Sequence, residues 1–193
     1  MKFGDGIDWN AEARRAAAAD DRNNAQGVVA KIDAIERLAE HLPSRGRVLD
    51  AGSNIGRYCP AVLAAGFQYV GVDQAQEALA IARERNPNGV FVESFLWDMK
   101  FDILFDAALS FAVLQHNTLP EKQRILGRIA AAVRVGGYFV MMESTVLQET
   151  VTQLTQAGWI SLVSGCGFEL VTTWHPNPDY GVNDHYLFRR TEA

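Results

Sequence analysis

The residues best suited to chemistry lie in one short loop near residue 50. Arg47–Ala51 is a short apolar stretch bounded by glycines, which predicts a buried strand. A tight glycine-bracketed loop and an Ala- and Leu-rich helical segment follow it. A strand, a glycine turn and a helix start bring backbone N–H groups to one point, which suits a carboxylate or phosphate. A turn made of glycine for packing alone is the alternative. The candidate binding residues here are Asp50, Gly52, Ser53, Asn54 and Gly56.

An acid follows the next strand at the spacing that a ribose site requires. Residues 67–73 read as a second strand, and Asp73 ends it at the same sheet edge as Asp50. Gly52 and Asp73 are 73 − 52 = 21 residues apart. A carboxylate roughly 20 residues past a glycine loop can accept hydrogen bonds from ribose hydroxyls. Gln74 beside it is a further candidate. The loop reads D-x-G-x-x-x-G and lacks the G-x-G-x-x-G that packs a pyrophosphate.

Together, this loop and acid resemble those of the class I S-adenosylmethionine-dependent methyltransferases. In that family a D/E-x-G-x-G-x-G loop holds the methionine half of the cofactor, and the acid after the second strand holds the ribose. The resemblance therefore implies S-adenosyl-L-methionine as the cofactor. Asn54 stands where the family usually has its middle glycine, and asparagine tolerates a left-handed backbone well.

The order of elements predicts the fold. Strands alternate with helices from residue 47 to residue 143, which argues for a parallel sheet covered on both faces. The last two strands have no helix between them and should pair as a hairpin. The fold class is therefore α/β, a Rossmann-like, doubly wound, mostly parallel seven-stranded sheet with a final antiparallel strand, plus N-terminal helices. The expected strands are 47–51, 67–73, 90–92, 104–110, 138–142, 168–174 and 185–189.

Local signals set several expected boundaries. Pro60 should delay the regular helix after the glycine loop to about Arg57–Cys59. Thr118 to Glu121 has capping-box spacing and should open a helix that runs to about Val133. Val135–Gly137 reads as a turn, and another helical region is expected over about Leu147–Ser164.

Two helices should precede the first strand. Residues 9–26 favour a helix that Asp8 caps, and residues 28–42 form an amphipathic one. In the resembled family such helices often fold over the ligand pocket. We therefore expect one methyltransferase domain over residues 1–193, with a helical lid at 1–43 and a Rossmann-like core at 44–193. Trp9 is either part of that lid or a surface anchor.

Two later loops complete the expected cofactor site. The family places adenine-binding residues after the third strand, so Ser94 and Phe95 are candidates, with Trp97 and Asp98 as second choices. Simple packing of the sheet edge is the alternative. After the fourth strand, a segment beginning with Ser110 and Phe111 resembles the one that lines the family's pocket beneath the sulfonium. His116 in it is either a pocket residue or a hydrogen-bonding group at a helix end.

Candidate catalytic residues follow from sheet geometry. Ligands in open α/β sheets bind outside the carboxyl ends of the parallel strands, and the chain leaves or enters that edge at Glu143, His175 and His185. A base is optional for methyl transfer, but it helps when the acceptor is a hydroxyl or an ammonium. We rank His185 first because a strand fixes it, His175 second, and Glu143 third because its pKa would have to rise. A polar rim without a catalytic role is the alternative.

The composition of the chain indicates which kinds of binding partner are not expected. The 193 residues carry a net charge of −5 and no basic run, so a nucleic-acid partner is not expected. No apolar run is long enough for a membrane span, and a cytoplasmic protein is expected. Cys59 and Cys166 are too few for a thiolate metal site, so no metal is predicted. The oligomeric state does not follow from the sequence.

The leading interpretation is an enzyme that methylates a small molecule at oxygen, nitrogen or carbon. The D/N-P-P-Y/F/W signature of adenine, cytosine and glutamine N-methyltransferases is missing after the fourth strand. A nicotinamide-dependent oxidoreductase is one alternative, which the missing pyrophosphate motif disfavours. A non-catalytic S-adenosylmethionine-binding relative is the other. A cofactor pocket that has lost its binding residues is disfavoured by the presence of Asp50, Gly52, Gly56 and Asp73.

Overall fold

The computed structural model describes residues 6–18, 25–145, 154–175 and 183–191. Their strands are β1 Arg47–Ala51, β2 Gln68–Asp73, β3 Val90–Glu93, β4 Phe105–Phe111, β5 Val133–Ser144, β6 Phe168–Trp174 and β7 Asn183–Arg190. The helices are α1 Trp9–Ala18, α2 Ala25–Ala39, α3 Cys59–Ala64, α4 Gln76–Arg85, α5 Leu119–Ala132 and α6 Gln156–Ser164, with a short 3-10 helix, η2, at Leu114–His116.

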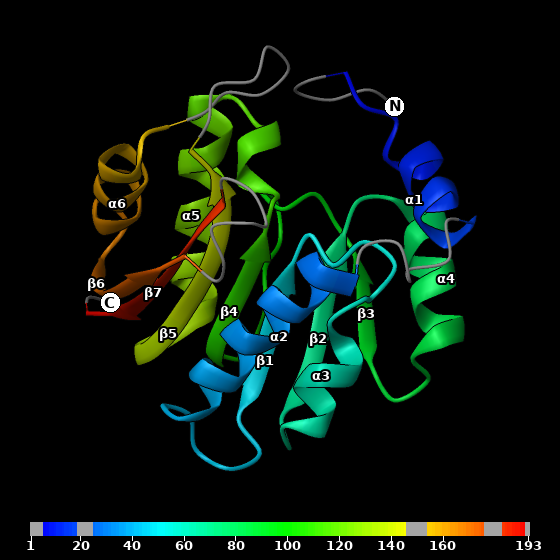
Figure 1. The fold of residues 1–193 in the computed structure, drawn as a ribbon, viewed down its shortest axis with the longest axis horizontal. Helices are drawn as coiled ribbons and strands as arrows, with labels where there is room; N and C mark the ends of the chain where they lie inside the picture. The colour runs from blue at the N-terminus through cyan, green and yellow to red at the C-terminus, as the bar shows by residue number, and fades with distance from the viewer. Residues whose placement is uncertain (1–5, 19–24, 146–153, 176–182, 192–193) are drawn as a thin grey trace.

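The strands form one seven-stranded sheet in the order β3-β2-β1-β4-β5-β7-β6. β1 to β5 run parallel, whereas β7 is antiparallel to both β5 and β6. This arrangement confirms the expected Rossmann-like sheet and the closing hairpin. Figure 1 shows α2 and α3 in front of β1 and β2, and α5 behind β4 and β5.

Alternating side chains of the strands separate two apolar cores. Leu49 on β1 packs into the core that α5 and α6 cover, and its neighbour Val48 packs into the core beneath α2, α3 and α4. This period of two is what a sheet buried on both faces requires. Because β1 to β5 run parallel, their carboxyl ends meet at one edge of the sheet.

Local chemistry explains where several helices begin. α3 begins at Cys59 with Pro60 in its first turn, as expected from the proline. The N–H and hydroxyl of Thr118 both donate to Glu121 Oε2, 2.7 Å away, so the predicted capping box opens α5. Asp8 Oδ1 accepts from the N–H of Ala11 at 3.0 Å and caps α1 as predicted.

α2 lies three residues earlier than expected, at Ala25–Ala39, and three further boundaries also differ. β5 begins at Val133, so the turn expected at Val135–Gly137 is wrong and those residues lie within the strand. A bulge against β4 lies opposite, and a Cβ on Gly137 would come within 2.7 Å of the Asp106 carbonyl oxygen. The glycine therefore permits a close approach of two strands.

The other two differences concern α6 and β7. α6 begins at Gln156, where Thr155 Oγ1 accepts from the N–H of Gly158 at 3.1 Å, so the helix does not run unbroken from residue 147. Residues 146–153 lie outside the described residues, as do 1–5 and 19–24 of the expected lid and 176–182 of the last loop. β7 begins at Asn183, two residues earlier than expected, because Asn183 and Asp184 pair with Ser144 and Glu143 of β5.

Candidate functional site

A cavity of about 220 Å³ lies at the carboxyl ends of β1, β2 and β4. Its walls come from α1, the loop after β1, the end of β2, the loop after β3, the segment between β4 and α5, and Ile125 of α5. The predicted residues that line it are Gly52, Ser53, Asn54, Asp73, Gln74 and Phe111. The predicted residues outside its lining are Asp50, Gly56, Ser94, Phe95, Ser110, Glu143, His175 and His185.

The loop after β1 needs its glycines for two reasons. Gly52 has φ +90° and Gly56 has φ +71°, which lie in the left-handed region that side chains rarely adopt. A Cβ on Gly52 would also lie 2.5 Å from Cγ2 of Val113, across the cavity wall. Asn54 is left-handed too, with φ +47°. The N–H groups of Gly52 and Ser53 donate to the carbonyl oxygen of Val72, which ties this loop to β2.

Asp73 joins the loop to the next strand. Its Oδ2 accepts from the N–H of Asn54 at 2.8 Å, and its Oδ1 accepts from the N–H of Ala75 at 2.9 Å. Burial raises the pKa of Asp73, and the N–H groups of Ala75, Asn54 and Gln74 oppose that rise. Each carboxylate oxygen has a second lone pair, so the group can still accept from a ligand hydroxyl.

Asp50 supports the loop from behind. It is buried, and its Oδ2 accepts from the hydroxyl of Tyr69 at 2.7 Å. A Cβ on Gly71 would lie 2.7 Å from Ser53 Oγ and 2.9 Å from the Tyr69 oxygen, so this glycine leaves room for both groups. Asp50 therefore lies in the layer beneath the cavity wall.

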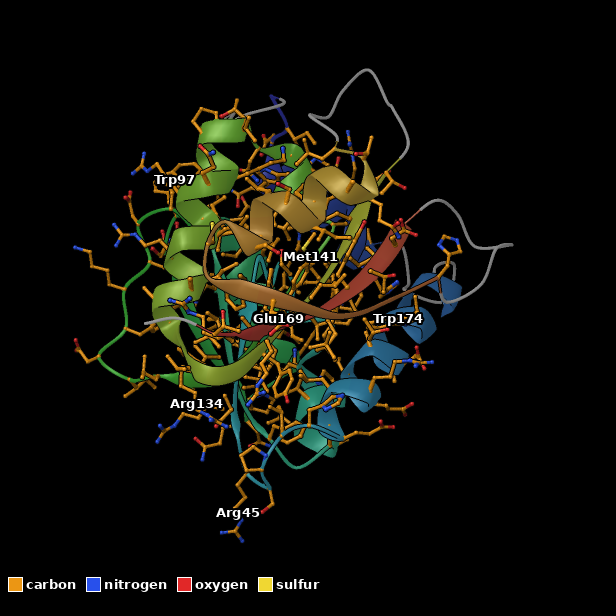
Figure 2. All side chains as sticks on the ribbon, turned by 90° about the vertical axis from the view of Figure 1, so that its left-hand side faces the viewer. Arg45, Trp97, Arg134, Met141, Glu169 and Trp174 are labelled. Atoms are coloured by element: carbon orange, nitrogen blue, oxygen red, sulfur yellow. The ribbon has the colours of Figure 1, made fainter. Side chains whose placement is uncertain are left out.

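Of the predicted adenine candidates in the loop after β3, Trp97 lines the cavity, whereas Ser94, Phe95 and Asp98 do not. Leu96 and Trp97 line the cavity. Phe95 lies beside Trp97, with ring centroids 5.0 Å apart and planes within 9°. Ser94 Oγ donates to the carbonyl oxygen of Phe95 at 3.0 Å. Figure 2 shows Trp97 next to α5, where its carbonyl oxygen accepts from Arg128 Nε at 3.1 Å.

The segment after β4 forms the opposite wall with Phe111, Ala112, Val113, His116 and Asn117. Ala112 has φ +58°, a conformation that costs a residue with a Cβ about 1–2 kcal/mol. Its N–H donates to the carbonyl oxygen of Met142 at 2.7 Å, which holds the turn against β5. Strain of this kind gathers at ligand sites, where the surrounding structure maintains it.

Glu143 lies behind that wall and has no exposed surface. Its Oε1 accepts from the N–H groups of Val113 and Leu114, and its Oε2 accepts from the N–H of Gln115. Burial raises the pKa of Glu143 to about 7, against those N–H groups and the charge of Lys122. Burial also lowers the pKa of Lys122 to about 8.

The two predicted catalytic histidines lie on the closing hairpin. His175 Nδ1 is 3.2 Å from Asp184 Oδ1. His185 is buried, and its ring centroid is 5.3 Å from that of Trp174. Figure 2 shows Trp174 at the end of β6 beside α2, where its Nε1 donates to Asp33 Oδ2 at 3.1 Å. Neither histidine lines the cavity, and their role as a base stays a prediction.

Helix α1 closes one side of the cavity with Trp9 and Ala16. The Trp9 ring meets His116 edge-on with centroids 5.0 Å apart. The helix lies against α4 (Figure 1), where Asn10 Oδ1 accepts from the N–H of Glu77 and Arg14 pairs with the Glu77 carboxylate. Of the expected lid, α1 therefore reaches the cavity, whereas no described residue of α2 lines it.

Sequence reasoning missed several lining residues. Arg57 and Tyr58 follow the last glycine of the loop, and Asn117 follows His116. The Tyr58 ring packs edge-on against Phe111 with centroids 5.1 Å apart. Nearness in sequence to a predicted loop was the only available signal, because irregular segments have no period that shows which side chains face inward.

Neither a metal site nor a membrane span occurs among the described residues. No group of three or more His, Cys, Asp or Glu side chains there is placed to hold a metal ion. No helix in the described parts of the chain has both the length and the apolar character of a membrane span.

Comparison with known proteins agrees with the fold. A family model described as a methyltransferase domain matches residues 21–175. An uncharacterized methyltransferase of Bacillus cytotoxicus is 27% identical over 136 residues, which are 67% of this chain and 64% of that protein. The chain thus spans less than two thirds of that relative's length.

Solved structures share the architecture at low sequence identity. An S-adenosylmethionine-dependent methyltransferase from Clostridium acetobutylicum aligns with a TM-score of 0.76 at 10% identity, over 94% of this chain and 100% of that one. The magnesium protoporphyrin IX methyltransferase of Synechocystis, solved with bound S-adenosylmethionine, aligns with a TM-score of 0.69 at 14% identity, over 96% and 99%.

Proposed function

The chain belongs to the methyltransferase domain family, and we propose on that premise that it transfers a methyl group from S-adenosylmethionine to a small-molecule acceptor, at oxygen, nitrogen or carbon. The observation that carries the proposal is that two features expected of a cofactor site meet in one cavity. The glycine loop after β1 and the Asp73 carboxylate are joined by a hydrogen bond and both line the same space.

The lining residues divide into parts that suit the parts of this cofactor. The loop from Gly52 to Gly56 is proposed to take the methionine end, because its left-handed backbone and missing Cβ atoms allow close approach. Asp73 and Gln74 would hold the ribose, and Leu96 and Trp97 would flank the adenine. Asp50, Ser94, Phe95 and Ser110 lie outside the lining, and their proposed role is to support these positions from behind.

The acceptor is proposed to enter between α1 and the segment after β4. The rings of Trp9, Tyr58 and Phe111 line that part of the cavity, together with the polar groups of His116 and Asn117. A mostly aromatic wall with few polar groups suits a small organic molecule. The net charge of −5 argues against a nucleic-acid acceptor.

Bound S-adenosylmethionine supplies a methyl group that is already activated. The task of this chain is then to hold the acceptor atom in line and to exclude water, and such positioning can supply about 7–11 kcal/mol of the barrier reduction. For an acceptor that must lose a proton, His185 and His175 remain the sequence-based candidates, and His116 joins them because it lines the cavity. Glu143, the third candidate, is wholly buried outside the lining, so we do not propose it as the base.

Titration calorimetry with S-adenosylhomocysteine and with NADH tests the cofactor directly. Binding of the first without the second is the expected result, and the reverse would favour the oxidoreductase alternative. Incubation with S-adenosylmethionine and a panel of small acceptors, read by mass spectrometry for methylated products, then separates an enzyme from a binding module. A chain that binds the cofactor but never transfers its methyl group would be the non-catalytic relative.

A further inference from the structure

A buried polar network lies behind one wall of the cavity. Glu143, at the end of β5, accepts hydrogen bonds from three consecutive backbone N–H groups, those of Val113, Leu114 and Gln115, at 3.2, 2.9 and 3.0 Å. Lys122, on the first turns of α5, is also wholly buried, and its Nζ donates to the carbonyl oxygen of Asn117. Hydrogen bonds from this network therefore hold segment 113–117 at both of its ends.

Further contacts tie the network to β5 and α6. Gln115 Oε1 accepts from the N–H of Ser144 at 3.0 Å, and the carbonyl oxygen of Ser144 accepts from Trp159 Nε1 at 3.3 Å. The Lys122 ammonium lies 5.6 Å from the centroid of the Trp159 ring. The support of segment 113–117 thus comes from three elements, α5, β5 and α6.

The same segment shapes the cavity. Val113, His116 and Asn117 line it, and the Val113 side chain is the group that a Cβ on Gly52 would strike. The segment also follows the strained Ala112 turn, whose conformation the surrounding structure must maintain. A small shift of residues 113–117 would therefore move one whole side of the site toward or away from the glycine loop.

We propose that Glu143 is a positioning residue: its carboxylate, with Lys122 as the counter-charge, fixes segment 113–117 at the spacing from the glycine loop that the bound ligand requires. The part of this inference that concerns the ligand rests on the proposed function. Glu143 acts here through the backbone of the wall, without touching the cofactor or the acceptor.

Only an ionised carboxylate can accept at both oxygens without offering a proton in return. Protonation would place a hydrogen on one oxygen of Glu143, opposite an N–H group that has nothing else to donate to. The groups around Glu143 are Lys122 from α5, Tyr186 and the register partner Asp184 from β7, and the backbone N–H groups of 113–115. Lys122 is the cation in this set that favours the ionised form of Glu143.

The main experiment replaces Glu143 with glutamine in the full chain. Glu143→Gln keeps the shape of the side chain but turns one acceptor oxygen into a donor that faces backbone N–H groups. We expect hydrogen-exchange protection of the amides of 113–115 to fall about tenfold or more, and the dissociation constant for S-adenosylhomocysteine to rise by a similar factor. Glu169→Gln, the same substitution on the exposed outer strand β6 (Figure 2), is the matched control and should behave like the wild type.

A pH series provides a readout that a purely structural role would not move. Protection factors of the amides of 113–115 in the wild type should fall as the pH drops from about 8 to about 6 and Glu143 takes up a proton. Glu143→Gln should give low values at every pH. Lys122→Met removes the nearby positive charge, so it should shift the midpoint of the wild-type transition to higher pH.

Specific outcomes would overturn the inference. Unchanged protection of 113–115 in Glu143→Gln, or an equal loss across all core strands, would mean that Glu143 does not act on this wall in particular. Loss of protection confined to the amides of 113–115, with unchanged affinity for S-adenosylhomocysteine, would mean that the position of this wall does not affect ligand binding. A wild-type chain that binds no S-adenosylhomocysteine would overturn the proposed function, while the protection factors, which need no ligand, would still decide whether Glu143 places the wall.

Discussion

The carboxylate of Asp73 accepts a hydrogen bond from the backbone N–H of Asn54 at 2.8 Å, so the acid after β2 and the glycine loop after β1 form one unit. Residues 19 positions apart in the sequence thereby share one orientation at the cavity. A ligand that contacts either of them meets a surface that the other has helped to shape.

Removing that carboxylate should weaken cofactor binding. For Asp73→Ala we expect the binding free energy of S-adenosylhomocysteine to drop by roughly 1.5–3 kcal/mol, the usual value for hydrogen bonds to a charged group. Calorimetry on the folded variant measures it. Glu93→Ala is the control, because Glu93 ends the neighbouring strand, pairs in register with Asp73 and is exposed outside the cavity lining. Equal affinity of Asp73→Ala and the wild type would remove Asp73 from the site.

Adding a methyl group at Gly52 should harm both stability and binding. Gly52→Ala places a Cβ within 2.5 Å of Val113 and also forces alanine to φ +90°. Gly66→Ala is the matched control, since Gly66 has φ +86° but no atom within 4 Å of the added Cβ. Urea unfolding should show both variants destabilised, and Gly52→Ala by about 1–3 kcal/mol more, the typical cost of overpacking. Similar losses in the two variants would show that Val113 moves aside freely.

The buried pair Glu143 and Lys122 predicts an unusual dependence of stability on pH. The pKa of Glu143 is raised from 4.5 to about 7, so the folded chain keeps a proton that the unfolded chain releases in that range, and stability should fall as the pH rises through it. The pKa of Lys122 is lowered from 10.5 to about 8, so its contribution to stability should rise again over that higher range.

Urea unfolding of the wild type and of Glu143→Gln between pH 5 and pH 8 measures the first effect. The fall in unfolding free energy that Glu143 causes should be missing from the variant. If both proteins showed the same pH dependence, Glu143 would titrate alike in the folded and unfolded states. The expected pattern means that the charge holding the cavity wall costs global stability, a trade common at functional sites.

Helix α1 is proposed to act as a lid over the bound ligand. Trp9 and Ala16 line the cavity, and ligand contact with them should slow hydrogen exchange of residues 6–18 when S-adenosylhomocysteine is added. The amides of α6, none of whose residues lines the cavity, provide an internal reference. Identical hydrogen exchange of residues 6–18 with and without ligand would mean that α1 is a fixed wall of the cavity and not a lid.

The proposed histidine base is tested by turnover. If His185 or His175 accepts a proton from the acceptor, its change to glutamine should lower kcat by about 10²–10⁴-fold while cofactor affinity stays constant. His116→Gln is measured beside them, because His116 lines the cavity and the other two do not. Wild-type rates in His185→Gln and His175→Gln would refute the base role of these two histidines.

Much of the fold was predictable because its signals are local. Apolar runs, breakers and caps indicate each strand and helix from neighbouring residues alone, and the alternation of β1 to α5 predicts the parallel sheet. The glycine loop and Asp73 were predictable for the same reason, since each terminates a strand and parallel strands bring such ends to one edge. These features require no knowledge of which side chains touch.

Contacts between distant segments were decided only by the tertiary structure. No pattern in the sequence indicates that Trp97 faces the cavity while Phe95 stacks beside it, because loop residues follow no period. The start of β5 was mispredicted because its glycines lie in an irregularity within β5, where the register against β4 shifts between Val133 and Tyr138, rather than in a turn. Glu143 looked like a free acid at the sheet edge, and only the folded chain brings three backbone N–H groups, from a segment 28 to 30 residues earlier, within reach of its carboxylate.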